Sequence, residues 1–281
     1  MTALTGVPLT NAQMRARNNN KRQEEALEAL EAKRRQREES ERAAAALFYK
    51  AAAEEPQPRS RRAVRLSAAI MAHPQRADMV QLLAERLDDE APVVWDEIQS
   101  RWDTGRRAML AYDPRATHHV VLQDDILIPR NLLAGLKRML HYVPSDVPIC
   151  GYVGRLRPQQ DRVRDLVAKA RAVNASFLTM RQLHWGPLIV VPVKHIDAMI
   201  AHCDPLNIPN YDMRISRYWE DHDYRVWYTW PSVVDHADGP SLVPGRITTR
   251  HATSSRIAHE FCGEEVSVLD LPWDGPVISG R

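Results

Sequence analysis

Two adjacent carboxylates end an apolar run in the middle of the chain. Residues 118–130 read HHVVLQDDILIPR, so Asp124 and Asp125 follow a stretch that is typical of a buried strand. Like charges side by side repel each other, and their burial is costly unless a counter-charge lies nearby. The pair is therefore either the solvated end of a strand or a site for a cation or a sugar.

The residues before this pair predict an alternation of strands and helices. Strand-like runs at 63–72, 91–96 and 118–125 are separated by helix-like runs at 76–87 and 105–114. This alternation indicates βαβ units with a parallel sheet, and ligands of such sheets bind beyond the carboxyl ends of the strands. We therefore expect Asp96 and the acidic pair on one rim, with Arg76 beside them.

The second half of the chain is less regular. A strand is expected around 187–191, a helix from about 193, an amphipathic helix over 211–222 and a strand over 224–236. The glycine- and proline-rich end of the chain predicts an irregular tail over 243–281. The expected folded domain spans residues 62–242.

A charged arm precedes this domain. Residues 20–53 are rich in Ala, Glu, Lys, Arg and Leu, which predicts a helix, and the two prolines of EEPQPRSRR suggest a linker. Residues 1–61 are thus a helical arm and linker. The arm is either a solvated extension or a means of oligomerisation or partner docking through 43–49.

Composition fits a globular protein of ordinary type. The chain has 281 residues, 44% of them apolar, and a formal net charge of +2, which does not by itself argue for nucleic acid or membrane as a partner. Cys150, Cys203 and Cys262 form no CxxC pair, so a reducing, cytoplasmic location is the expectation. Since no run approaches the ~20 apolar residues of a membrane helix, no membrane insertion is expected.

The order of four motifs resembles a known enzyme family. An apolar strand ending in QDD is followed by WGP, then YDMR on a helix, then WPSVVDH. This order resembles nucleotide-sugar-dependent glycosyltransferases of the GT-A fold, most of all small bacterial and phage-encoded members, over about 65–242. The resemblance implies an α/β fold with a Rossmann-like, mixed, mostly parallel sheet flanked by helices.

The resemblance also implies a divalent cation, Mn²⁺ or Mg²⁺, that bridges the phosphates of a nucleoside diphosphate-sugar. Carboxylate oxygen suits both ions, and imidazole suits manganese. By position, Asp125 is the expected metal ligand, Asp124 a ribose contact, and His236 the late ligand, with Asp235 as its competitor. Gln123 stands where the family often has an acid.

The other site residues are expected on the same grounds, each with a structural alternative. Asp212 is the expected catalytic base or a helix N-cap. Asp96 is a nucleoside contact or a turn residue, and Arg106 a diphosphate contact or part of a surface salt bridge. Trp185 and Gly186 border the acceptor, or Trp185 belongs to the core.

These expectations describe a metal-dependent, hexosyltransferase-like enzyme. It would move a sugar from a nucleoside diphosphate-sugar to an acceptor hydroxyl on a protein, a glycan or modified DNA. A nucleic-acid-binding or virion assembly protein that uses the basic residues of the arm and linker is the alternative from another class. A nucleotidyltransferase is a further alternative, because it shares the sheet and the use of a metal.

Overall fold

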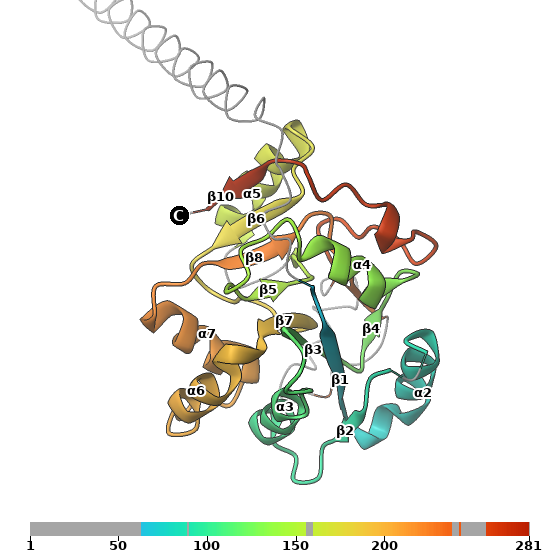
Figure 1. Ribbon diagram of the computed structural model, residues 1–281, viewed down its shortest axis with the longest axis vertical. Helices are drawn as coiled ribbons and strands as arrows, with labels where there is room; N and C mark the ends of the chain where they lie inside the picture. The colour runs from blue at the N-terminus through green and yellow to red at the C-terminus, as the bar shows by residue number, and fades with distance from the viewer. Residues whose placement is uncertain (1–62, 89, 156–159, 238–241, 243–256, 281) are drawn as a thin grey trace, which may run out of the picture. The chain divides into compact units, whose positions relative to one another are not determined.

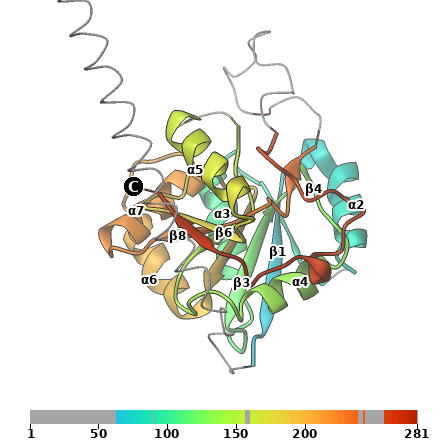
Figure 2. The same cartoon turned by 90° about the horizontal axis from the view of Figure 1, so that it is seen from above.

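An eight-stranded mixed sheet crosses the protein and helices cover both of its faces (Figures 1 and 2). In spatial order its strands are β10 (Val277–Ser279), β6 (Phe177–Met180), β8 (Val226–Thr229), β5 (Ile149–Cys150), β7 (Leu188–Pro192), β3 (His118–Gln123), β1 (Leu66–Ala72) and β2 (Val93–Trp95). Four of the seven neighbouring pairs are parallel. The expected mixed, mostly parallel sheet flanked by helices is confirmed.

The helices divide into groups by what they contact. They are α2 (Ala77–Arg86), α3 (Arg101–Leu110), α4 (Leu132–Met139), α5 (Gln160–Ala172), α6 (Val193–Cys203) and α7 (Tyr211–Asp221). Helices α3, α6 and α7 contact one another, and α3 and α6 also contact the central strands β1, β3 and β7. Helix α5 packs instead on β6 and β10. Helix α5 and strand β6 were not predicted from the sequence pattern.

The order of the first three strands creates a switch point in the sheet. Strand β1 lies between β2 and β3 and is parallel to both. The chain therefore moves outward through α2 to β2, then returns through α3 past β1 to β3. Since such crossovers are right-handed, the two helices lie on opposite faces, and sheets of this kind form their ligand-binding crevice at such a switch point, here the carboxyl ends of β1 and β3.

A buried histidine ties β3 to its neighbours. The His119 ring is fully buried, and its Nε2–H donates to the carbonyl oxygen of Ala108 in α3 over 2.8 Å. With the proton on Nε2, the Ser67 hydroxyl of β1 donates to Nδ1 over 2.9 Å. Burial lowers the pKa of His119 from 6.5 to about 4, against the opposing effect of these hydrogen bonds. The imidazole is therefore neutral in the folded protein.

The expected irregular tail is partly ordered and belongs to the sheet. Strand β10 pairs in parallel with β6 at one edge. Before it, Trp273 is almost fully buried and stacks on Phe177, with ring centroids 5.6 Å apart. A short 3-10 helix, η3 (Val268–Asp270), lies against α4. The prediction of a tail from residue 243 failed here because a few apolar residues in a glycine- and proline-rich segment show no periodicity, yet complete the core.

The structure describes residues 63–88, 90–155, 160–237, 242 and 257–280, all within the unit Pro56–Arg281. The predicted arm and linker, residues 1–61, lie outside the described residues. In the described part of the chain, no helix has the length and apolar character needed to cross a membrane.

The neutral state of His119 predicts acid sensitivity. Because its folded pKa of about 4 lies below the unfolded value of 6.5, the unfolded chain binds more protons between these values, so stability is full above pH 6.5 and falls as pH drops. We expect His119→Gln to reduce the loss of unfolding free energy between pH 7 and pH 4 by on the order of 2 to 3 kcal/mol. Urea unfolding at a series of pH values across this range measures the unfolding free energy of both proteins.

The matched control is His222→Gln, since His222 is exposed. We expect this variant to keep the wild-type dependence on pH. Identical pH slopes for wild type and His119→Gln would show that the buried imidazole is not the source of acid sensitivity.

Candidate functional site

The acidic pair lies in the crevice at the switch point. The parallel register pairs Met71 of β1 with Gln123 of β3, so His73 and Asp125 leave the sheet at the same edge. Asp124 and Asp125 are each only 5% exposed. The pair is therefore a buried feature of the crevice and not the solvated end of a strand.

Asp124 fastens the turn that follows β1. Its Oδ2 accepts a hydrogen bond from the backbone N–H of His73 over 2.7 Å, and its Oδ1 accepts one from Arg76 Nη1, also over 2.7 Å. Burial raises the pKa of Asp124 and outweighs the lowering effect of the Arg76 charge. Ionised Asp124 thus depends on the arginine beside it.

Arg76 contacts both members of the pair. The same Nη1 that reaches Asp124 lies 3.1 Å from Oδ2 of Asp125. Two carboxylates therefore share one guanidinium. The expected place of Arg76 on the rim beside the acidic pair is observed.

A two-stranded sheet brings His236 to Asp125. Strand β4 (Ile126–Leu127) pairs with β9 (Asp235–His236), and the N–H of Ala237 donates to the carbonyl oxygen of Asp125 over 2.9 Å. His236 Nδ1 lies 3.6 Å from Asp125 Oδ1. Asp235, the competing candidate, instead accepts hydrogen bonds from the N–H groups of His236 and Ala258. The geometry favours His236 over Asp235 as a partner of Asp125.

These residues fit a cation of the magnesium or manganese type. Two donors bound to one such ion at about 2.1 Å each lie about 3 Å apart in octahedral geometry, so the 3.6 Å between Asp125 Oδ1 and His236 Nδ1 needs little adjustment. No group of three or more His, Cys, Asp or Glu side chains placed to hold an ion occurs among the described residues. The protein would supply few ligands, and Mg²⁺ commonly completes its shell with water and substrate phosphates.

A series of aromatic rings in mutual contact begins at His236. Tyr152 makes an edge contact with His236 at 5.3 Å between centroids and with Trp185 at 6.0 Å. Trp185 in turn meets Tyr228 at 5.9 Å. Trp185 is half-buried. Sequence reasoning missed Tyr152, which stands alone in a short loop after β5.

Tyr211 joins the WGP loop to the start of α7. Its hydroxyl donates to the carbonyl oxygen of Gly186, and a Cβ added to Gly186 would lie 2.6 Å from that hydroxyl oxygen. Burial raises the pKa of Tyr211 well above its usual value, with smaller contributions from the charges of Asp212 and, last among the causes, Asp125. The missing side chain of Gly186 is therefore explained by the close approach of Tyr211.

Asp212 is the second residue of α7. The N-cap is Asn210, so the N-cap interpretation of Asp212 is not what the structure shows. Its carboxylate is half-buried and contributes to the raised pKa values of Tyr211, Cys150 and Tyr228, each of which is raised mainly by burial. A carboxylate in the first turn of a helix is also stabilised by the helix dipole.

Asp96 and Arg106 have different surroundings. The N–H of Asp96 donates to the carbonyl oxygen of Ala72 at the end of β1, which places Asp96 on the expected rim. Its Oδ1 also accepts a hydrogen bond from the N–H of Ser100. Arg106 instead donates through Nε to both carboxylate oxygens of Asp204, at 2.9 and 3.2 Å. A diphosphate role for Arg106 stays a prediction, and Arg76 is the arginine found at the acidic pair.

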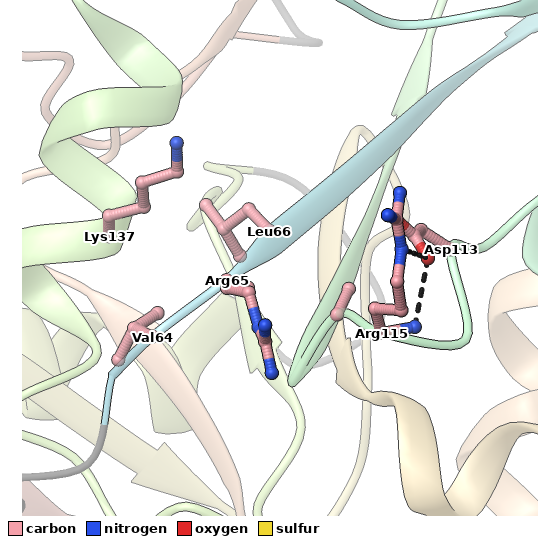
Figure 3. A pocket seen from close by; sticks show the side chains of 7 residues that line it. Val64, Arg65, Leu66, Asp113, Arg115 and Lys137 are labelled. Carbon is pink, nitrogen blue, oxygen red and sulfur yellow. Dashed lines mark hydrogen bonds and ion pairs between the residues drawn. The ribbon is translucent and has the colours of Figure 1, made fainter.

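A polar pocket of about 330 Å³ lies at the opposite end of β1 (Figure 3). Its charged lining residues are Arg65, Lys137, Arg115 and Asp113, of which the last two form an ion pair at 2.9 Å. Because it opens at the amino end of β1, a seven-residue strand separates it from the acidic crevice. The pocket is therefore a cationic site that is distinct from the acidic pair.

Comparison with known proteins gives little beyond this geometry. No model of a protein family and no curated protein matches the chain. One solved structure that is similar to this chain is a mutant of Drosophila β-1,4-galactosyltransferase 7 in complex with manganese, UDP-Gal and xylobiose. The two sequences are 10% identical. The match covers 73% of this chain and 83% of that chain at a TM-score of 0.38. This similarity is too low to carry an argument.

The contact between Gly186 and Tyr211 can be tested by a double-mutant cycle. We expect Gly186→Ala to lower the unfolding free energy by about 1 to 3 kcal/mol, because the new methyl group overlaps the phenol. Tyr211→Phe removes the hydroxyl and should recover part of this cost in the double variant. Gly280→Ala, beyond β10, is the control that should add to Tyr211→Phe without coupling. Strict additivity at Gly186 would mean that the two residues do not meet.

Proposed function

We propose that this protein is a metal-dependent glycosyltransferase that uses a nucleoside diphosphate-sugar. The observation that carries the proposal is the buried acidic pair at the switch point, with Arg76 and His236 on its two sides. A diphosphate needs concentrated positive charge, and this crevice offers a guanidinium together with donors for a divalent cation. The resemblance of the motif order to GT-A enzymes supports the same proposal.

Each crevice residue has a role in this proposal. Asp125 and His236 would hold the cation, Asp124 and Asp96 would contact the nucleoside, and Arg76 would bind the diphosphate. When bound, Mn²⁺ or Mg²⁺ would offset the negative charge that builds up on the leaving phosphate. The half-buried ring of Trp185 would offer an apolar face for the acceptor.

In the inverting form of the reaction, Asp212 is the proposed base. Its carboxylate would take the proton of the acceptor hydroxyl as that oxygen bonds to the anomeric carbon of the sugar. The bond between the anomeric carbon and the phosphate oxygen breaks, and its electron pair leaves with the nucleoside diphosphate. The acceptor is proposed to be a hydroxyl of a protein, a glycan or modified DNA.

Asp125→Asn tests the proposed function. We expect sugar transfer or donor hydrolysis in Mn²⁺ to fall by about 100-fold or more, because the amide is a poorer ligand without charge. The assay measures nucleoside diphosphate released from UDP-, GDP- and TDP-sugars. Circular dichroism and thermal unfolding would confirm that the fold persists.

The control is Asp223→Asn, on an exposed carboxylate paired with Arg181, which should leave activity unchanged. If no donor sugar is bound or hydrolysed by the wild-type protein, the proposal is wrong. Release of pyrophosphate, in place of a nucleoside diphosphate, would identify a nucleotidyltransferase.

The cationic pocket favours nucleic-acid binding as a second candidate function. Arg65, Arg115 and Lys137 line it, and in the sequence RSRR directly precedes Ala63. Cationic side chains of this kind bind phosphodiesters without regard to base sequence, and such binding weakens steeply with salt. This function is compatible with a transferase whose acceptor is nucleic acid.

Replacement of Arg65, Arg115 and Lys137 by alanine tests the second candidate. We expect the affinity for a DNA duplex at low salt to fall at least about tenfold, and the slope of log affinity against log salt to become shallower by about 2 to 3. Fluorescence anisotropy across a salt series measures both quantities.

A triple alanine variant at Lys169, Arg171 and Arg181 carries the same change in charge away from the pocket and should bind as wild type does. If both triple variants lose affinity equally, binding depends on net charge and not on the pocket. Deletion of residues 1–60 would separate the contribution of the arm.

A further inference from the structure

Arg76 places a largely buried positive charge against the acidic pair. It ends the 3-10 turn η1 (Pro74–Arg76) that directly follows β1, where the hydrogen bond from the His73 N–H to Asp124 secures the turn. Its side chain is only 15% exposed, against 6% and 7% for Asp124 and Asp125. Charges buried to this degree need a counter-charge to remain ionised, and here the chain supplies one itself.

The position of this guanidinium conflicts with a cation on Asp125. One oxygen of Asp125 faces Arg76 at 3.1 Å and the other faces His236 at 3.6 Å. A divalent ion between Asp125 and His236 would therefore share a single carboxylate with the guanidinium. Two positive centres held so close, among side chains that are at most 15% exposed, repel each other strongly.

We propose that Arg76 occupies the acidic pair in the absence of substrate and that a divalent cation binds tightly only when a diphosphate draws the guanidinium away. This inference rests on the proposed function. A diphosphate offers Arg76 a doubly hydrogen-bonded acceptor in exchange for the carboxylates. The same diphosphate also supplies oxygen ligands to the cation, so each ligand favours the binding of the other.

The charges at the site also favour the exchange of the two carboxylates for a diphosphate as the partner of Arg76. A divalent cation alone would add two positive charges beside the guanidinium of Arg76. A diphosphate that arrives with the cation brings negative charge that offsets these positive charges, so the two ligands together suit the crevice better than the cation alone. Arg76 would then bind the diphosphate of the donor in place of the two carboxylates.

The test is the affinity of the full-length chain for Mn²⁺, measured by calorimetry and by the paramagnetic resonance signal of the unbound ion. In wild type we expect UDP, GDP or TDP to raise this affinity by about tenfold or more, after correction for the complex of nucleotide and Mn²⁺ in solution. In Arg76→Gln we expect Mn²⁺ alone to bind about tenfold more tightly than in wild type. The gain from nucleotide should shrink correspondingly.

Two further variants serve as controls for the effect of Arg76→Gln on Mn²⁺ affinity. Arg76→Lys keeps the charge but has no fork to span two carboxylates, so its Mn²⁺ affinity should fall between those of wild type and Arg76→Gln. This variant also serves if Arg76→Gln fails to fold. Arg86→Gln, ten residues further on, breaks a half-exposed pair with Glu264 and should leave Mn²⁺ affinity at the wild-type value.

The possible outcomes distinguish a failure of this inference from a failure of the proposed function. If wild type transfers sugar with Mn²⁺ but Arg76→Gln and Arg76→Lys bind the ion no more tightly than wild type, the inference is wrong and the function stands. Transfer that is insensitive to EDTA would also overturn it, because Arg76 would then replace the cation altogether. If no variant binds Mn²⁺ and no donor sugar stabilises the wild-type protein, the proposed function itself fails.

Discussion

Two like charges buried side by side are the constraint on which the crevice depends. Asp124 and Asp125 can stay ionised only because neighbouring segments bring donors and positive charge to them. The turn after β1 supplies a backbone N–H and the guanidinium of Arg76, and β9 supplies the imidazole of His236. The cost of burying the pair is therefore offset by segments that are distant in sequence, which is why the fold and the site depend on each other.

Much of this arrangement could be predicted from the residues before the crevice. The alternation of apolar runs indicated parallel strands, and parallel strands end at one edge, so Asp96, Arg76 and the acidic pair were expected together. The structure has them there, joined through Ala72 and His73. Local periodicity was enough because Asp96 and the acidic pair directly follow strands whose direction the pattern sets, and Arg76 ends the short turn after β1.

Other features depend on contacts that leave no local pattern. Tyr152 occupies a loop between short elements, and its place between His236 and Trp185 follows only from the pairing of β5 in the sheet. Strand β10 lies in a segment rich in turn-forming residues, and it is held by the burial of Trp273 against β6. Tertiary packing overrides local propensity at such positions, because the free energy comes from burial and not from the chain's own preference.

The crevice can be well ordered around a substrate even though the protein alone supplies few ligands. Tyr211 holds the WGP loop to the first turn of α7, and therefore holds Asp212 at a defined place relative to Trp185. The pairing of β4 with β9 does the same for His236 relative to Asp125. Positions fixed by backbone pairing and by a buried phenol need little reordering when a ligand arrives, and preorganisation of this kind is what allows a site to stabilise developing charge. Arg76 belongs to the short turn η1 outside the sheet, so its side chain can change partner in the proposed reaction without displacing a strand.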